Sequence, residues 1–178
     1  MNIFDRITYM EKESVVKFIK TDDIADKVKA LFGAEKEHLA KNFPNAIIEH
    51  VGGTSIPGSI SKGDLDVNIR VQSEDFENTV EILKTLYNVH RPDTWPEGFA
   101  CFKDVPRNLD IQLTIIGSAG DYFVTQREYL KNHPKVVSEL NALKEQFEGK
   151  DEREYGNAKG KFFEHLNSII IPSQNIND

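Results

Sequence analysis

The chain has 178 residues, 29% of them charged, and a formal net charge of −7 at pH 7. This length suits one domain with a single hydrophobic core, and the negative charge argues against binding along a nucleic-acid backbone, which requires a basic surface. Because Cys101 is the only cysteine and no apolar run reaches the length of a membrane span, we expect a cytoplasmic protein without disulfides.

The N-terminal part predicts an arm, a strand and a helix, in that order. Residues 1–12 show no periodicity and are interpreted as a loose arm, whereas the apolar residues within 13–20 indicate a short strand at a sheet edge. The segment Thr21–Asp23 is suited to begin a helix, because short side-chain oxygens satisfy free backbone N–H groups there. Apolar residues then keep helical spacing over about 24–42, and Pro44 ends the helix.

The next segment combines a glycine turn with an alternating strand. The apolar run 46–48 predicts a buried strand that ends near Val51, and the two glycines of 52–55 allow positive φ and a close approach of the backbone to a ligand. Polar and aliphatic residues then alternate from 64 to 71. Because the side chains of a strand switch faces at every residue, Asp64 and Asp66 lie on one face and the aliphatic residues on the other.

The two aspartates and the glycine turn together predict a site for a divalent cation and phosphates. Adjacent carboxylates are costly unless a positive charge lies between them, and Mg²⁺ prefers one or two protein carboxylates together with water and phosphate oxygens. A glycine turn just upstream offers backbone N–H groups to those phosphates. The turn residues expected to hold the phosphates are Gly52, Gly53, Thr54 and Ser55.

Two basic residues, Lys62 and Arg70, flank the aspartates. Each is a candidate for a phosphate contact, although an ion pair with an aspartate explains either of them equally well. His50 precedes the turn and is interpreted as a hydrogen-bonded core histidine. Trp95 and Cys101 are interpreted as packing residues, and stacking of Trp95 on a base is left open.

The second half of the chain predicts a helix, a loop, two strands and three further helices. The expected bounds are 73–87 for the helix, 90–98 for the loop, 99–105 and 109–116 for the strands, and 120–132, 134–148 and 151–170 for the last helices. In the second strand Asp110, Gln112 and Thr114 share a face. Asp110 can therefore point the same way as Asp64 and Asp66, although a satisfied polar group near a sheet edge is the alternative until the strand pairing is known.

One motif resembles the signature of the nucleotidyltransferase superfamily: Val51-Gly52-Gly53, a gap of ten residues, and Asp64-Leu65-Asp66-Val67. The resemblance implies a third carboxylate that stands alone between apolar residues on a later strand, and Leu109-Asp110-Ile111 fits that description. It also implies that these three aspartates bind two Mg²⁺ ions and are the catalytic residues.

A second, narrower resemblance is to the GrpB family and covers about residues 15–170. Residues 49–58, with Lys62 following, are similar to the family's EHIGSTSVPG…K segment. The pieces that resemble its C-terminal motif are residues 128–134, 143–144 and 155–159. Surface lysines on helices are usually only solvated, but this resemblance selects Lys144 and Lys159 as candidates to close over the phosphates.

The chain departs from the usual GrpB pattern in its acidic residues. Typical members have Lys-Pro-apolar-apolar-Asp where this chain has Lys62-Gly63-Asp64-Leu65-Asp66, and they tend to have histidines at the positions of Asp110 and Gln112. This chain therefore has a fuller acidic set, which favours metal-dependent chemistry.

These patterns predict an α+β fold: a nucleotidyltransferase-like, mixed, mostly antiparallel sheet flanked by helices, with a helical C-terminal part. We expect one domain over 1–178, with its core at about 13–118 and C-terminal helices at about 119–171. The predicted function is Mg²⁺-dependent transfer of a nucleoside monophosphate from an NTP to a hydroxyl-type acceptor, a small molecule or a protein rather than bulk nucleic acid. The alternative is a non-catalytic GrpB-type module that binds a nucleotide or small metabolite, and an Asp110 that points away from the other aspartates would favour it.

Overall fold

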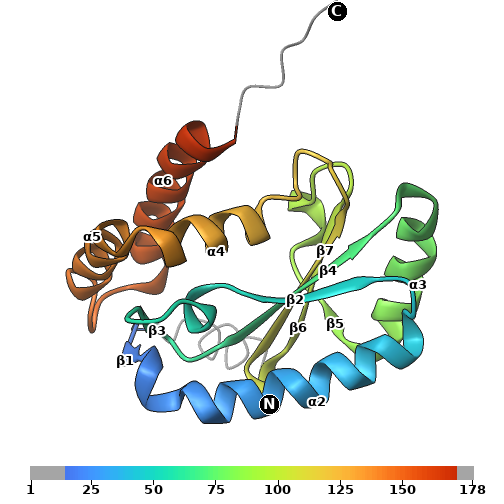
Figure 1. Ribbon diagram of the computed structural model, residues 1–178, viewed down its shortest axis with the longest axis horizontal. Coiled ribbons are helices and arrows are strands. Elements are labelled where there is room, and N and C mark those ends of the chain that lie inside the picture. Colours follow the sequence, from blue (N-terminus) through green and yellow to red (C-terminus); the bar gives the residue numbers. More distant parts are fainter. Residues whose placement is uncertain (1–14, 172–178) are drawn as a thin grey trace, which may run out of the picture.

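The computed structural model describes residues 15–171, built around a five-stranded sheet with the order β2-β4-β7-β6-β5 (Figure 1). Its strands are β2 (Ile47–Val51), β4 (Leu65–Val71), β5 (Asn88–Val89), β6 (Phe99–Asp104) and β7 (Leu109–Ile115). The central strands β4 and β7 pair in parallel and the other three pairs are antiparallel, so the predicted mixed, mostly antiparallel sheet is confirmed.

Five α-helices surround this sheet in the described part of the chain. They are α2 (Ala25–Asn42), α3 (Phe76–Leu86), α4 (Phe123–Asn132), α5 (Pro134–Glu145) and α6 (Glu152–Ile170). The predicted starts at Thr21 and Ser73 are 3-10 turns, η1 (Thr21–Ile24) and η3 (Ser73–Asp75), that lead into α2 and α3. Within residues 15–171, no helix has the length and apolar character needed to cross a membrane.

The strands differ from the predictions in three places. The predicted strand over 13–20 is reduced, within the described residues, to β1 (Ile19–Lys20), which pairs with β3 (Ile60–Ser61) in a separate two-stranded sheet. Strands β3 and β5 were not predicted, because a strand of two residues carries no alternation that sequence reasoning can detect. The predicted arm, residues 1–12, lies outside the described residues.

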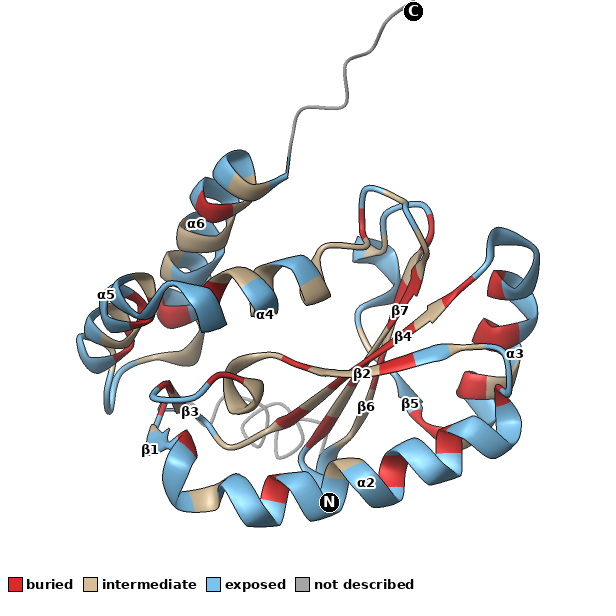
Figure 2. Cartoon of the chain, viewed as in Figure 1, coloured by how far each residue is buried: buried red, intermediate tan, exposed pale blue. Residues whose placement is uncertain are grey.

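The main hydrophobic core lies between one face of the sheet and helices α2 and α3, where buried residues gather in Figure 2. Its sheet side includes the aliphatic residues of β4 and β7, as the alternation predicted, together with Ile48 of β2 and Ala100 and Phe102 of β6. Burial of each such side chain contributes about 1.5–3 kcal/mol to folding. Trp95 packs against this core at Phe102 and donates its indole N–H to His90 O at 2.9 Å, which confirms it as a packing residue.

A second, smaller core joins α4, α5 and α6 to the glycine turn. Its buried members are Ile56, Leu130, Val137, Leu140 and Leu166. Ile56 follows the turn directly, so the helical C-terminal part packs against the loop between β2 and β4 as well as against itself.

The face of the sheet turned away from α2 and α3 is polar, and the register aligns its residues in rows. Lys103 of β6, Asp110 of β7 and Asp66 of β4 form one row, and Gln112 and Asn68 belong to the next. Because residues paired across strands point to the same face, these rows bring the predicted acids together.

Candidate functional site

A cleft of about 900 Å³ lies between this polar face and helices α4, α5 and α6. Most of the residues predicted to form a site line it: Gly52, Gly53, Lys62, Asp64, Asp66, Asp110, Lys144 and Lys159. The cleft lining does not include Thr54, Ser55 and Arg70.

The three aspartates come from two adjacent strands and open on the same cleft. Asp66 lies directly opposite Asp110 in the parallel register, and Asp64 immediately precedes β4. Two of the three carboxylates have lysine partners: Lys62 Nζ lies 3.6 Å from Asp64 Oδ2, and Lys103 Nζ lies 3.2 Å from Asp110 Oδ1. Asp110 therefore opens on the same cleft as Asp64 and Asp66, while its carboxylate pairs with Lys103 of the neighbouring strand β6.

Asp66 forms no ion pair with a lysine or arginine of residues 15–171; its Oδ1 accepts a hydrogen bond of 3.0 Å from Gln112 Nε2. The pKa of Asp66 is raised to about 7, chiefly by burial and also by the charges of Asp64 and Asp110, against the opposing effect of Lys159. The site thus holds a carboxylate whose negative charge the surrounding chain does not balance.

This donor set fits a hard divalent cation. The ligands on offer are carboxylate oxygens, and the nearby Gln112 Oε1 and Asn68 Oδ1 are buried acceptors without a hydrogen-bond donor in the described residues. No three carboxylate, histidine or cysteine side chains of residues 15–171 already converge as a metal-binding group. A bound cation would therefore have to draw Asp64 and Asp110 away from their lysines.

The glycine turn is shaped by its contact with Asp66. Gly52 has a φ of 72°, and a Cβ at this position would overlap Asp66 Oδ2. A Cβ on Gly53 would lie 3.1 Å from Ser61 Oγ and 3.7 Å from Lys144 Nζ. The turn therefore lies against Asp66 at Gly52 and near Ser61 and Lys144 at Gly53, and only glycine fits at Gly52.

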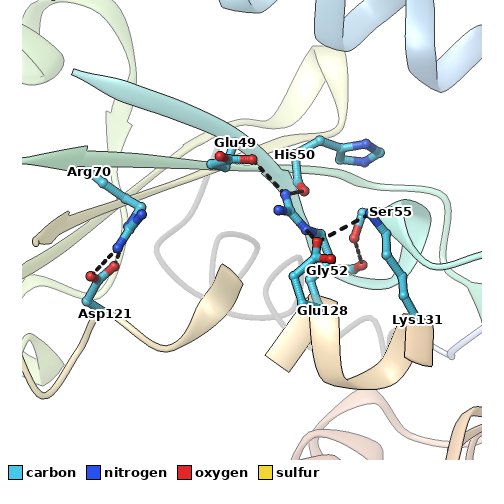
Figure 3. Close-up of polar contacts among 9 residues, drawn as sticks. Glu49, His50, Gly52, Ser55, Arg70, Asp121, Glu128 and Lys131 are labelled. Atoms are coloured by element: carbon cyan, nitrogen blue, oxygen red, sulfur yellow. Dashed lines mark hydrogen bonds and ion pairs between the residues drawn. The ribbon is translucent and has the colours of Figure 1, made fainter. Parts of the chain in front are cut away.

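The hydroxyl groups of the turn are engaged with the backbone. Ser55 Oγ donates to Gly52 O at 2.7 Å (Figure 3), and Thr54 Oγ1 donates to Asp64 O at 3.0 Å. Thr54 Oγ1 also lies 3.0 Å from His50 Nε2. These side chains brace the turn and the start of β4 from outside the cleft.

His50 is a packed, neutral residue. Its ring stacks on Phe32 of α2 with centroids 5.3 Å apart. The pKa of His50 is lowered to about 4, chiefly by burial and also by the charges of Arg127 and Lys131. His50 is therefore hydrogen-bonded, as expected, but half-buried rather than fully enclosed in the core.

The structure does not bring Arg70 to the aspartates of the cleft. Its guanidinium forms a two-pronged ion pair with Asp121, with N–O distances of 2.6 and 2.5 Å (Figure 3). Asp121 also accepts from Gly117 N at 2.9 Å, so Arg70 fixes the loop between β7 and α4. Its partner lies 51 residues away in sequence, which no local pattern reveals.

Lys144 is a buried lysine that ties α5 to the loop after the glycine turn. Its side chain is 3% exposed, and Nζ donates to Ser59 Oγ at 3.1 Å and to Ile60 O. One turn earlier, Asn141 Nδ2 donates to Gly58 O at 2.8 Å and its Oδ1 accepts from Ile60 N at 3.0 Å. The pKa of Lys144 is lowered to about 8, chiefly by burial and then by the charge of nearby Lys159.

Sequence reasoning missed part of the positive charge of this cleft. The basic residues that line it are Lys62, Arg91, Arg127, Lys144, Arg153 and Lys159. The three arginines went unnoticed because they belong to no motif and the net charge of −7 averages over the whole chain. Arg127 also connects α4 to β2, since its Nη1 donates to Glu49 Oε2 at 2.8 Å and to His50 O at 2.7 Å.

Comparison with known proteins places these features in a family. The family model described as GrpB protein matches residues 19–168. A UPF0157 protein from Vibrio cholerae serotype O1 is 31% identical over 153 residues, which cover 85% of this chain and 81% of that protein.

Solved structures with a similar fold include the conserved protein GrpB from Enterococcus faecalis, with a TM-score of 0.63 and 17% identity over 80% of this chain and 94% of that chain. Two structures of Cid1, an RNA terminal uridylyl transferase and poly(U) polymerase, have TM-scores of 0.45 with 11% and 10% identity, over 79% of this chain and 43% and 44% of theirs. From the family match and the identity to its relative, the chain belongs to the GrpB family.

Proposed function

We propose that this GrpB protein transfers a nucleoside monophosphate from an NTP to a hydroxyl-type acceptor, a small molecule or a protein, with the help of Mg²⁺. The observation that carries the proposal is the division of charge in the cleft. Asp66 of β4, Asp110 of β7 and Asp64, which directly precedes β4, form one wall, and the facing helices supply lysines and arginines.

The triphosphate would lie between the two walls. Lys144 and Lys159 offer positive charge from α5 and α6, and the close approach of Gly53 to Lys144 places turn and lysine side by side. Charge-assisted hydrogen bonds from lysine to phosphate oxygens are stronger than those between neutral groups. These residues would therefore bind the donor and stabilise the charge that develops on the leaving pyrophosphate.

Asp64, Asp66 and Asp110 would hold the metal, which when bound neutralises the triphosphate and steadies the attacking and leaving oxygens. The acceptor oxygen forms a bond to the α-phosphorus, the bond from that phosphorus to the β-bridging oxygen breaks, and pyrophosphate leaves. Asp110, at the edge of the acidic row, takes the proton of the acceptor hydroxyl.

A second candidate function is a non-catalytic module that binds a nucleotide or small metabolite. The ion pairs of Lys62 with Asp64 and of Lys103 with Asp110 favour it, because they neutralise two of the three carboxylates without a metal. In such a module, ligand binding would not depend on Mg²⁺ or on the aspartates.

Calorimetric titration with ATP, CTP, GTP and UTP, with and without Mg²⁺, separates the two functions. We expect one NTP to bind only with Mg²⁺, and the double variant Asp64→Asn, Asp66→Asn to lose this binding. Asp26→Asn, at an exposed position on α2, is the matched control and should behave as wild type. Equal binding without Mg²⁺, or by the double variant, would support the binding module. Transfer that persists in Asp66→Asn would contradict the catalytic scheme.

A further inference from the structure

We propose that the acceptor is a small phosphorylated alcohol and that Arg91 binds its phosphate. This inference rests on the proposed function and names the class of its second substrate. It comes from the position, conformation and charge of Arg91 at the end of the cleft opposite the lysines of α5 and α6.

Arg91 reaches the cleft from the far edge of the sheet. It follows β5, the last strand in the order β2-β4-β7-β6-β5, whereas α4 packs on β2 at the other edge. The strands that carry the aspartates, β4 and β7, lie between these edges. The acidic row is thus flanked by Lys144 and Lys159 on one side and by Arg91 on the other, and all of them line the same cleft.

The backbone at Arg91 is in the left-handed region, with φ 47° and ψ 54°. This conformation is unfavourable for a residue other than glycine, so the surrounding hydrogen bonds must hold it. Arg91 O accepts from Thr94 N at 3.0 Å and from Thr94 Oγ1 at 2.9 Å. The preceding carbonyl, His90 O, accepts from Trp95 Nε1 at 2.9 Å and from Cys101 Sγ at 3.0 Å. Hydrogen bonds therefore hold the backbone of Arg91 in place, while its side chain is exposed.

The guanidinium of Arg91 forms no ion pair with a carboxylate of residues 15–171, in contrast to Arg70 and Arg127. Lys103 adds positive charge beside Asp110, at 3.2 Å. Burial lowers the pKa of His90, and the charges of Lys103 and Arg91 lower it further while Asp110 raises it, so these groups share one electrostatic neighbourhood. This end of the cleft offers a fork-shaped cation that suits a phosphate.

The chemistry of transfer assigns this end to the acceptor. The attacking oxygen must approach the α-phosphorus in line with the leaving pyrophosphate and from the opposite side. With the triphosphate against Lys144 and Lys159, the acceptor hydroxyl enters beside Asp110, and Arg91 is then the cleft-lining cation without a carboxylate partner that is available to the rest of the acceptor. A cleft of about 900 Å³ has the size range of sites that hold a nucleotide and a small molecule.

The test is a titration of the full chain with sn-glycerol 3-phosphate, in which binding is monitored by the amide chemical shifts in NMR spectra. We expect shifts in residues 90–110, no binding of glycerol, and an affinity about tenfold lower in Arg91→Gln, as for the loss of one charge-assisted contact. Arg91→Lys should lose less than Arg91→Gln. Lys135→Gln, which removes one exposed charge on α5, is the matched control and should keep wild-type affinity.

Three results would overturn the proposal: unchanged affinity in Arg91→Gln, equal binding of glycerol, or tighter, Arg91-dependent binding of an RNA oligonucleotide than of the small phosphate. Calorimetry of NTP binding by Arg91→Gln distinguishes failure of this inference from failure of the proposed function. We expect that variant to bind NTP as wild type does. If wild type binds no NTP, the proposed function fails, whereas the glycerol 3-phosphate titration still reports on Arg91.

Discussion

At the residue scale, Asp66 makes stability depend on pH in an unusual direction. Burial, with the charge of Asp64 next in importance, raises its pKa from 3.8 to about 7. The folded protein therefore holds this proton more tightly than the unfolded chain does. The contribution of Asp66 to stability is fully present below about pH 4, declines as the pH rises from about 4 to 7, and is lost above pH 7.

We predict that Asp66→Asn is more stable than wild type at pH 8 and equally stable at pH 4, in the absence of divalent cations. Each pKa unit corresponds to about 1.4 kcal/mol, and because the carboxylate borders the cleft we expect a gain on the order of 1–2 kcal/mol. Denaturant unfolding at the two pH values measures it, with Asp26→Asn as the control. A variant that is less stable than wild type at pH 8 would show that Asp66 has a favourable electrostatic environment.

Thr54 connects His50 to the backbone of Asp64. Its single hydroxyl proton goes to Asp64 O at 3.0 Å, so the contact of 3.0 Å with His50 Nε2 requires the histidine to donate. We predict that Thr54→Val lowers the free energy of unfolding by about 1–3 kcal/mol, because it leaves a partly buried donor and acceptor unpaired. Thr54→Ser keeps both hydrogen bonds and should stay within about 0.5 kcal/mol of wild type. Equal stability of the two variants would contradict the hydrogen-bonded chain.

At the scale of elements, local pattern predicted the strands that carry the site but not their partners. The alternation over 64–71 predicted that Asp64 and Asp66 share the polar face of the strand, because side chains two residues apart in a strand lie on the same face. That Asp110 stands opposite Asp66 depends on the register of β4 with β7, which the sequence pattern does not encode. The ion pair between Arg70 and Asp121 was not predicted either, because the two residues are distant in sequence and are brought together only by the fold.

The glycine turn offers a matched pair of substitutions within one loop. Gly52 and Gly58 have nearly the same φ, 72° and 71°, but a Cβ on Gly52 would overlap Asp66 Oδ2 whereas one on Gly58 would meet nothing within 4 Å. We predict that Gly58→Ala costs on the order of 1 kcal/mol from backbone strain, and that Gly52→Ala costs at least about 2 kcal/mol more.

Gly52→Ala should also abolish Mg²⁺-dependent NTP binding under conditions in which it is still folded, whereas Gly58→Ala should retain it. Denaturant unfolding and calorimetry on both variants provide the measurement. If the two alanines cost the same, Asp66 does not press against the turn as described.

At the scale of the whole molecule, the site lies where two hydrophobic cores meet. Asn141 and Lys144 hold the segment 58–60 to α5, and Ile56 enters the core of the C-terminal helices. The sequence predicted the helices and, through a family resemblance, Lys144. It did not predict that this lysine would be buried, because a lysine on a helix is usually solvated.

Because Lys144 is buried, we expect the protein to take up a proton when it binds an anion. With a pKa near 8, this lysine is partly neutral at pH 8.5, and a bound polyphosphate would stabilise its charged form and raise the pKa. Asp66, with a pKa near 7, is already mostly ionised at that pH, so its titration does not mask the effect.

We predict that binding of inorganic tripolyphosphate at pH 8.5 is accompanied by proton uptake in the wild type, and that this uptake disappears in Lys144→Met. Calorimetry in buffers with different ionisation enthalpies measures the number of protons. Asn141→Ala is the control, because it weakens the same attachment of segment 58–60 to α5 but keeps the titrating group. Proton uptake that survives in Lys144→Met would assign it to another group. Its loss in Asn141→Ala as well would mean that the attachment of α5, rather than the charge of Lys144, controls anion binding.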